Sequence, residues 1–98
     1  MSEPARQTTL YVIAYDIPND RRRTKVHKIL SGFGRWTQFS LFEAWLTDKE
    51  LIAMRGKLDL HLNREQDSVR FYHLCSPCVA KVETVGRPAP QEEALFVV

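Results

Sequence analysis

An apolar run at residues 10–15 ends abruptly at an aspartate and is followed by a turn and three consecutive arginines. The stretch spans Leu10–Arg23 and reads LYVIAYDIPNDRRR. Valine, isoleucine and tyrosine favour a buried strand, whereas Pro18 and Asn19 break it and favour the start of a helix. The stretch therefore predicts a buried strand that carries one carboxylate, Asp16, at its C-terminal end, beside a helix N-terminus rich in guanidinium groups.

The expected position of Asp16 favours a ligand site. Ligands in α/β architectures bind at the C-terminal ends of strands. A carboxylate there can hold a metal ion, and positive charge beside it can hold phosphate, which together suggest nucleic-acid chemistry. The alternative is a turn residue whose carboxylate accepts backbone N–H groups, and the residues alone favour that alternative over catalysis.

Positive charge is concentrated in the first third of the chain. The 98 residues carry a formal net charge of +2. Residues 1–35 hold seven basic and three acidic residues, a balance of +4, whereas the remainder holds seven basic and nine acidic residues. The arginines at 21–23 oppose the dipole of the predicted helix, whose N-terminus prefers anions. Their position therefore favours phosphate binding over a solvated helix face.

Length and composition predict one small domain of an ordinary globular kind. No apolar run in the sequence is long enough to span a membrane, and no signal-peptide pattern opens it, so a cytoplasmic protein is expected. Residues 1–98 are expected to form a single domain, in which residues 87–93 are a Pro-rich linker and residues 94–98 a C-terminal strand.

The hydrophobic pattern predicts the first elements. A strand is expected over Leu10–Tyr15 and a helix from an Asn19 or Asp20 cap to Ser31, with one apolar stripe at helical spacing. The next stretch, at residues 35–46, is apolar on both sides and too long for one regular strand. A tight hairpin or a bulge near residues 39–41 is expected to divide it.

The second half of the chain opens with a capping box. Thr47 and Glu50 match the pattern S/T-x-x-E directly before a periodic apolar run, which predicts a second amphipathic helix. A polar loop is expected over Asn63–Asp67 and a strand over Ser68–Cys75. Residues Val79–Val85 alternate weakly and are interpreted as a further strand.

Two cysteines stand in a CSPC motif. Cys75 and Cys78 are open to interpretation as half of a zinc site, as a redox pair, or as small residues that flank a turn. A zinc site needs about four ligands. A redox motif of this spacing opens a helix after a strand, whereas Val79–Val85 resembles another strand. We therefore interpret the cysteines as two half-buried residues beside a turn.

The expected element order defines the fold class. The order β-α-β-(β)-α-β, with one or two small strands after it, predicts an α+β, ferredoxin-like βαββαβ sandwich. Two helices cover one face of the antiparallel sheet and leave the other bare. Because several strands are apolar on both sides, a second copy is expected to cover the bare face in a two-fold homodimer. Residues 94–98 are expected to be exchanged and to extend the partner's sheet.

The ordered set of motifs resembles a known family. The segments that carry the resemblance are LYVIAYDI at residues 10–17, Arg22–Val26, Gln38–Phe42, Cys75–Gly86 and the final Phe-Val-Val. Together they resemble the CRISPR-associated Cas two family of spacer acquisition, over nearly the whole chain. No single segment is specific, and the order of the segments in a chain of this length carries the resemblance.

The resemblance implies a ferredoxin-like homodimer and two candidate functions. The first is a Mg²⁺-dependent endonuclease that acts on single-stranded RNA or on double-stranded DNA. The second is a non-catalytic dimeric adaptor that bridges copies of the Cas one integrase and holds DNA for insertion into the CRISPR array. Both functions need the basic cluster, and only the first needs the aspartate for activity.

The resemblance also assigns site residues. The family's aspartate falls on Asp16, which is expected to be the catalytic and metal-binding residue. Because one copy offers a single carboxylate there, Asp16 and its symmetry mate are expected to form a shared metal site. The family's basic positions fall on Arg22 or Arg23 and on Lys25. Together with the other charges of the basic cluster, the expected nucleic-acid-binding residues are Arg21, Arg22, Arg23, Lys25 and Arg35. The expected supporting residues are Tyr15, Gln38, Ser40 and Phe42; for Tyr15, core packing and substrate stacking remain equal alternatives.

Overall fold

The computed structural model describes residues 7–86, which form four strands and three helices. The strands are β1 (Thr9–Asp16), β2 (Arg35–Gln38), β3 (Leu41–Leu46) and β4 (Ser68–Leu74). The helices are α1 (Asp20–Ser31), α2 (Asp48–Asp59) and α3 (Ser76–Val79). The predicted order of the first six elements is thereby confirmed.

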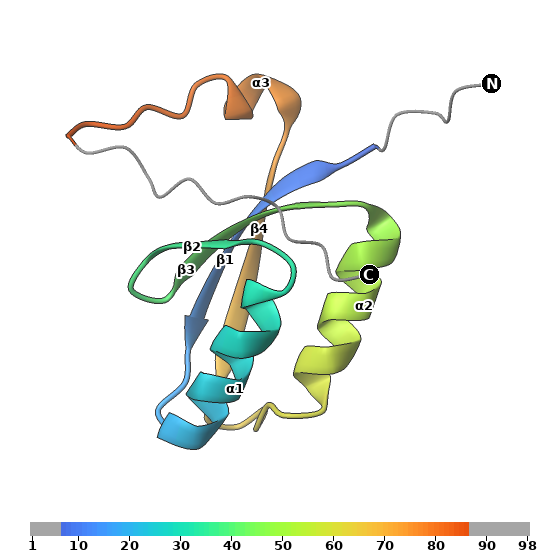
Figure 1. Cartoon of the computed structure of the whole chain (residues 1–98), viewed down its shortest axis with the longest axis vertical. Helices are drawn as coiled ribbons and strands as arrows, with labels where there is room; N and C mark the ends of the chain where they lie inside the picture. Colours follow the sequence, from blue (N-terminus) through green and yellow to red (C-terminus); the bar gives the residue numbers. More distant parts are fainter. Residues whose placement is uncertain (1–6, 87–98) are drawn as a thin grey trace.

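The sheet has the strand order β2-β3-β1-β4, and all neighbouring strands are antiparallel. Helices α1 and α2 lie side by side over one face of this sheet, and α3 lies at the far end of β4 (Figure 1). This is the ferredoxin-like arrangement, so the predicted α+β fold class is confirmed. The predicted linker at 87–93 and the exchanged strand at 94–98 lie outside the described residues.

The core lies between the sheet and the two long helices. Strand β1 alternates: Tyr11, Ile13 and Tyr15 are buried against the helices, whereas Asp16 is exposed on the opposite face. The other fully enclosed side chains come from α1, β3 and α2, and are Val26, Leu30, Phe42, Leu46, Met54 and Leu58. In the part of the chain that the structure describes, no helix has the length and apolar character needed to cross a bilayer.

Caps and turns agree with the expectations for the first two helices and the hairpin. Asn19 caps α1, because its side chain accepts a hydrogen bond from the Arg22 amide, and the capping box of Thr47 and Glu50 is closed in both directions. The β2–β3 connection contains both a register shift and a turn, in which Phe39 takes the left-handed conformation with φ 45°. The predicted division of residues 35–46 is confirmed.

The predicted strand over Val79–Val85 is wrong. Residues Ser76–Val79 form the short helix α3, with Cys75 as its N-cap, and residues 80–86 belong to no helix or strand. Pro77 fits the first helical turn, because its fixed φ is helical and no intrahelical partner is needed for its missing N–H. The prediction of half-buried cysteines is also wrong, since Cys75 and Cys78 are both exposed.

The face of the sheet opposite the helices remains open within residues 7–86. It exposes the aromatic side chains of Trp45 and Tyr72, by 51% and 48%, on strands β3 and β4. This bare apolar face agrees with the sequence pattern from which we predicted a homodimer. The dimer itself remains a prediction.

An ion pair ties the start of α1 to the loop before β4. The guanidinium of Arg22 donates from Nε and Nη2 to the two carboxylate oxygens of Asp67, at 2.7 and 3.0 Å. The Asp67 side chain has no exposed surface and also accepts the Asn63 amide at 2.9 Å. The hydrogen bond from Arg22 is the main reason why the pKa of Asp67 lies below its usual value.

The pH dependence of stability tests this pair. A carboxyl group with a lowered folded pKa stabilises the fold above its unfolded pKa of about 3.9, and the contribution is lost as the pH falls through the folded pKa. We expect Asp67→Asn to melt several degrees below the wild type at pH 7, and the gap to close as the pH falls below about 4. Thermal unfolding followed by circular dichroism from neutral to acidic pH measures this gap.

The matched control is Asp59→Asn, because Asp59 pairs with Arg64 at 3.1 Å on the exposed surface. Exposed pairs contribute little, so this variant is expected to melt like the wild type at every pH. A gap for Asp67→Asn that stays constant down to strongly acidic pH would show that ionisation of Asp67 is not what stabilises the loop.

A second prediction concerns the close approach of the chain at Gly34. A Cβ there would lie 2.6 Å from the Cβ of Ala44 and against the backbone oxygen of Glu43, so Gly34→Ala forces the connection between α1 and β2 away from β3. We expect a loss of about 1–3 kcal/mol in the free energy of unfolding. The control is Gly56→Ala on α2, where a Cβ meets nothing within 4 Å and stability should rise by about 0.5–1 kcal/mol. Urea unfolding measures both, and equal stability of the two variants would refute the contact.

Candidate nucleic-acid interface

Asp16 is the last residue of the central strand β1, and it pairs in register with Ser68 of β4. Its side chain is exposed on the open face of the sheet. Within residues 7–86 no hydrogen bond or ion pair engages its carboxylate, so the alternative of a turn residue that accepts backbone N–H groups does not describe it. A carboxylate left free at a strand end keeps both oxygens for a ligand from outside the chain.

Arg22 and Arg23 are bound within the chain. Arg22 is engaged with Asp67, and its Nη2 also donates to Gln66 at 3.0 Å. Arg23 folds back over the β1–α1 connection, where its Nη1 donates to the carbonyl oxygen of Ile17 at 2.9 Å and its Nη2 pairs with Asp20. These acidic partners offset the conflict with the helix dipole, so the dipole no longer argues for phosphate at these two residues.

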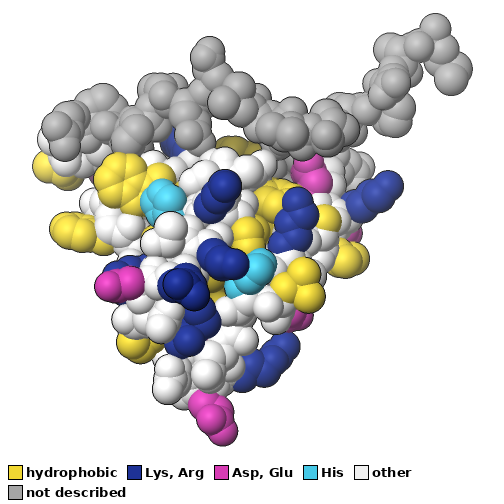
Figure 2. Space-filling model, turned by 60° about the horizontal axis from the view of Figure 1, so that its bottom comes forward, with side chains coloured by type: hydrophobic (Ala, Val, Ile, Leu, Met, Phe, Trp, Pro, Cys, Tyr) yellow, Lys and Arg dark blue, Asp and Glu magenta, His cyan; other side chains and the backbone are white. Residues whose placement is uncertain are grey.

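The remaining cations of α1 form an exposed stripe. Arg21, Lys25 and Lys28 stand at i, i+4 and i+7, the spacing that places residues on one face of a helix, and all three are exposed. None of the three is held by an ion pair within the described chain. Lysine and arginine side chains gather on the surface that includes this end of the molecule, with acidic side chains toward its edge (Figure 2). We call Arg21, Lys25 and Lys28 the basic stripe.

Arg35 lies on a different element. It begins β2 and pairs with Glu43 of β3, with 3.2 Å between Arg35 Nη2 and Glu43 Oε1. The register places Arg35 and Glu43 opposite each other, and Val12 opposite Glu43, so the pair belongs to the open face of the sheet. The structure therefore separates Arg35 from the basic stripe on the helix layer.

Three of the four predicted supporting residues meet beneath α1. The Tyr15 hydroxyl lies 3.1 Å from Nδ1 of His27, and the His27 ring meets the edge of Phe42 at 5.1 Å between ring centroids. The Tyr15 amide donates to the carbonyl oxygen of Ser40 at 3.1 Å. Burial raises the pKa of Tyr15, while a side-chain hydrogen bond with Ser40 lowers it by less. Core packing describes Tyr15 and Phe42, since both are buried.

Gln38 does not join this cluster. It ends β2 at the register shift, is exposed, and lies opposite Leu41. His27 and Lys28, in contrast, belong to the region and were missed by the sequence reasoning. The spacing from Arg21 and Lys25 was enough to find Lys28, whereas the contact of His27 with Tyr15 has no local signal.

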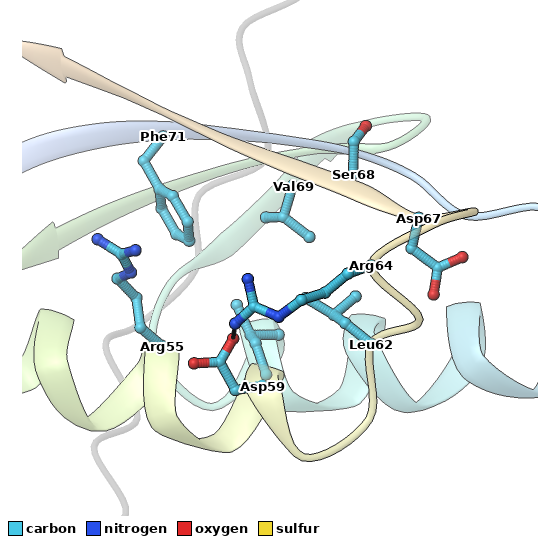
Figure 3. A pocket seen from close by; sticks show the side chains of 9 residues that line it. Arg55, Asp59, Leu62, Arg64, Asp67, Ser68, Val69 and Phe71 are labelled. Carbon is cyan, nitrogen blue, oxygen red and sulfur yellow. Dashed lines mark hydrogen bonds and ion pairs between the residues drawn. The ribbon is translucent and has the colours of Figure 1, made fainter.

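A groove lies between α2 and β4 near this end. It has a volume of about 270 Å³, and its labelled side chains come from α2, the following loop and β4 (Figure 3). Its cations have partners: Arg64 pairs with Asp59, and the Arg55 guanidinium lies 5.6 Å from the centre of the Phe71 ring. Its carboxylates are paired as well, Asp59 with Arg64 and Asp67 with Arg22, so the groove offers no free carboxylate comparable to Asp16.

No cluster of three or more histidine, cysteine, aspartate or glutamate side chains suited to a metal ion occurs within residues 7–86. Asp16 thus provides one oxygen-donor group per chain, of the kind that Mg²⁺ prefers. A complete protein ligand set at this position needs a second chain or the phosphates of a substrate.

Comparisons with known proteins agree on one family. The family model described as CRISPR associated protein Cas2 matches residues 9–82. The chain is 42% identical over 79 residues to a protein of Synechocystis sp. named CRISPR-associated endoribonuclease Cas2 3. The match covers 81% of this chain and 86% of that protein.

Solved structures share the fold. A hypothetical protein of Thermus thermophilus, TT1823, has a TM-score of 0.76 and 34% identity, covering 89% of this chain and all of that one. A chain from a structure entitled a partial Cas6-RT-Cas1–Cas2 complex has a TM-score of 0.69 and 24% identity, covering 92% of this chain and 99% of that one, and indicates the fold alone. Because the family model matches about three quarters of this chain, the chain belongs to the CRISPR-associated Cas2 family.

Proposed function

We propose that the protein is a homodimeric, Mg²⁺-dependent endonuclease of CRISPR spacer acquisition that hydrolyses RNA phosphodiesters, with Asp16 as its catalytic and metal-binding residue. The observation that carries this proposal is the exposed carboxylate of Asp16, which is free of partners within the described chain. The name of the Synechocystis relative, an endoribonuclease, supports RNA as the substrate.

The open face of the sheet explains why a dimer is part of the proposal. Asp16 shares that face with the exposed rings of Trp45 and Tyr72. A second copy that covers the apolar rings would also bring its own Asp16 to the interface. Two carboxylates then replace the single one that each chain offers.

The residues of this chain fit the needs of phosphodiester hydrolysis as follows. The Asp16 carboxylates of two copies would hold Mg²⁺, which when bound would activate a water and neutralise charge on the phosphate. The histidine nearest to Asp16 along the chain, His27, belongs to α1 and has its Nδ1 engaged with the Tyr15 hydroxyl, whereas Asp16 is exposed on the opposite face of the sheet. The chain's own contribution is therefore carboxylate placement and phosphate orientation.

The basic stripe is suited to hold the strand that is cut. From Arg21 to Lys28 the helix rises about 10 Å, which is close to the axial length of three nucleotides in one strand of a duplex. Contacts of this kind orient a backbone without reading its sequence. We assign the stripe to phosphate, and Arg22 and Arg23 to holding α1 and the loop in front of it.

A second candidate is the non-catalytic adaptor, in which the dimer bridges subunits of the Cas1 integrase and holds duplex DNA. The similarity of fold to a chain of the Cas1–Cas2 complex is compatible with this role. The basic stripe serves it equally, because an adaptor needs phosphate contacts and no free carboxylate.

Substitution of Asp16 separates the two candidates. For a nuclease we expect Asp16→Asn to lower the rate of RNA cleavage by about 100-fold or more, because loss of a metal ligand costs at least as much as loss of the groups that support one. Cleavage by the wild type should need Mg²⁺ and stop with EDTA. The assay follows labelled single-stranded RNA and duplex DNA in parallel.

The matched control is Asp20→Asn, four residues away and paired with Arg23 on the surface. It should cleave at the rate of the wild type. Cleavage by Asp16→Asn at the wild-type rate would place the catalytic centre elsewhere. A wild type that binds duplex DNA with Mg²⁺ present and cleaves neither substrate would leave the adaptor as the function.

The salt dependence of binding tests the basic stripe. Each lost phosphate contact reduces the slope of log K against log salt by about 0.9 on duplex DNA and about 0.7 on a single strand. Arg21→Ala combined with Lys25→Ala is therefore expected to reduce the slope by about twice that amount, measured by fluorescence anisotropy. Lys49→Ala, an exposed cation of α2, serves as the control with an unchanged slope. An unchanged slope for the double variant would make the stripe an ordinary solvated face.

A further inference from the structure

The CSPC motif forms a surface turn far from Asp16. Leu74 and Ser68 lie at opposite ends of β4, and they pair with Leu10 and Asp16 at opposite ends of β1. Helix α3, which contains Cys78 and follows its N-cap Cys75, therefore sits at the end of the sheet away from the β1–α1 connection (Figure 1). The motif is independent of the proposed nuclease site.

The two sulfur atoms face each other at short range. Cys75 and Cys78 are free and exposed, and 2.9 Å separates their Sγ atoms. A disulfide bond is about 2.05 Å long, so the two Sγ atoms need to move only about 0.9 Å closer together to form one. The turn that holds them is closed by its own backbone, since the amides of Cys78 and Val79 donate to the carbonyl oxygen of Cys75 at 2.9 and 3.0 Å.

The environment distinguishes the two thiols. The hydrogen bond with Cys78 is the main cause that lowers the pKa of Cys75, while the same interaction raises the pKa of Cys78. A thiolate on one sulfur of this pair would accept the S–H of the other, so the contact favours ionisation of one of the two thiols. Cys75 also lines a cavity of about 210 Å³ with His73 and Trp45, into which Cys78 does not extend.

We propose that Cys75 and Cys78 are a redox-active dithiol that exchanges with low-molecular-weight disulfides, with Cys75 as the attacking and Cys78 as the resolving thiol. The Cys75 thiolate attacks a sulfur of the disulfide, forming a mixed disulfide and releasing one thiolate of the reagent. Cys78, giving up its proton, attacks Cys75 Sγ and releases the second thiolate. One disulfide is reduced to two thiols, and the protein dithiol is oxidised to one disulfide.

The structure thus reverses the reason for setting a redox pair aside. A redox pair of this spacing requires a helix that begins at the motif, directly after a strand. Helix α3 begins there, directly after β4. The alternative of a zinc site receives no support from the structure, because no cluster of three suitable ligands occurs within residues 7–86.

The experiment is a redox titration of the full 98-residue chain with reduced and oxidised glutathione. Because the chain holds only two cysteines, the mass of the intact protein after maleimide labelling reports both thiols without ambiguity. We expect one transition, from two labels to none, with loss of a pair of hydrogen atoms. At a given glutathione ratio the disulfide should be about tenfold more populated in the folded chain than in the urea-unfolded chain, because the fold holds the sulfurs together.

Two variants assign the roles. Cys78→Ser is expected to accumulate one glutathione on Cys75. Cys75→Ser is expected to react with glutathione disulfide several-fold more slowly than Cys78→Ser does. The proposal is overturned if the wild type gains two glutathiones, links chain to chain, stays reduced, or favours the disulfide no more than the unfolded chain does. Equal reaction rates of the two variants would overturn the assignment of Cys75 as the attacking thiol.

Discussion

The alternation of the central strand β1 governs both the core and the candidate site. Successive residues of a strand point to opposite faces, so Tyr15 is buried against the helices and Asp16 is exposed on the open face. Because β1 pairs with β3 on one side and β4 on the other, a one-residue shift of its register would move its buried side chains to the open face. The position of the carboxylate is therefore fixed by the burial of its neighbour.

Local patterns in the sequence were sufficient for most of the fold. The end of the apolar run at Asp16, the capping box of Thr47 and Glu50, and the long stretch at residues 35–46 each depend on neighbours within a few residues. Pro77 was ambiguous, because proline both interrupts a strand and fits the first turn of a helix, and only the structure distinguishes these outcomes.

The roles within the arginine cluster could not be predicted in this way. The partner of Arg22 is Asp67, 45 residues further along, and nothing in the local sequence connects them. The helix dipole made three arginines at an N-terminus look costly, and that cost was attributed to phosphate binding. The structure offsets it internally at Arg22 and Arg23, which leaves Arg21, with Lys25 and Lys28, as the cations available to a partner.

Residues to which the proposal gives no phosphate contact therefore set the geometry of the proposed interface. The Tyr15 hydroxyl contacts His27 in the middle of α1, while Arg23 holds the carbonyl of Ile17 and Arg22 holds the loop before β4. These contacts fix the rotation of α1 about its axis relative to the end of β1. Since the basic stripe occupies one face of that helix, its direction relative to Asp16 follows from the same contacts, and loosening them would misalign phosphate and carboxylate without removing either group.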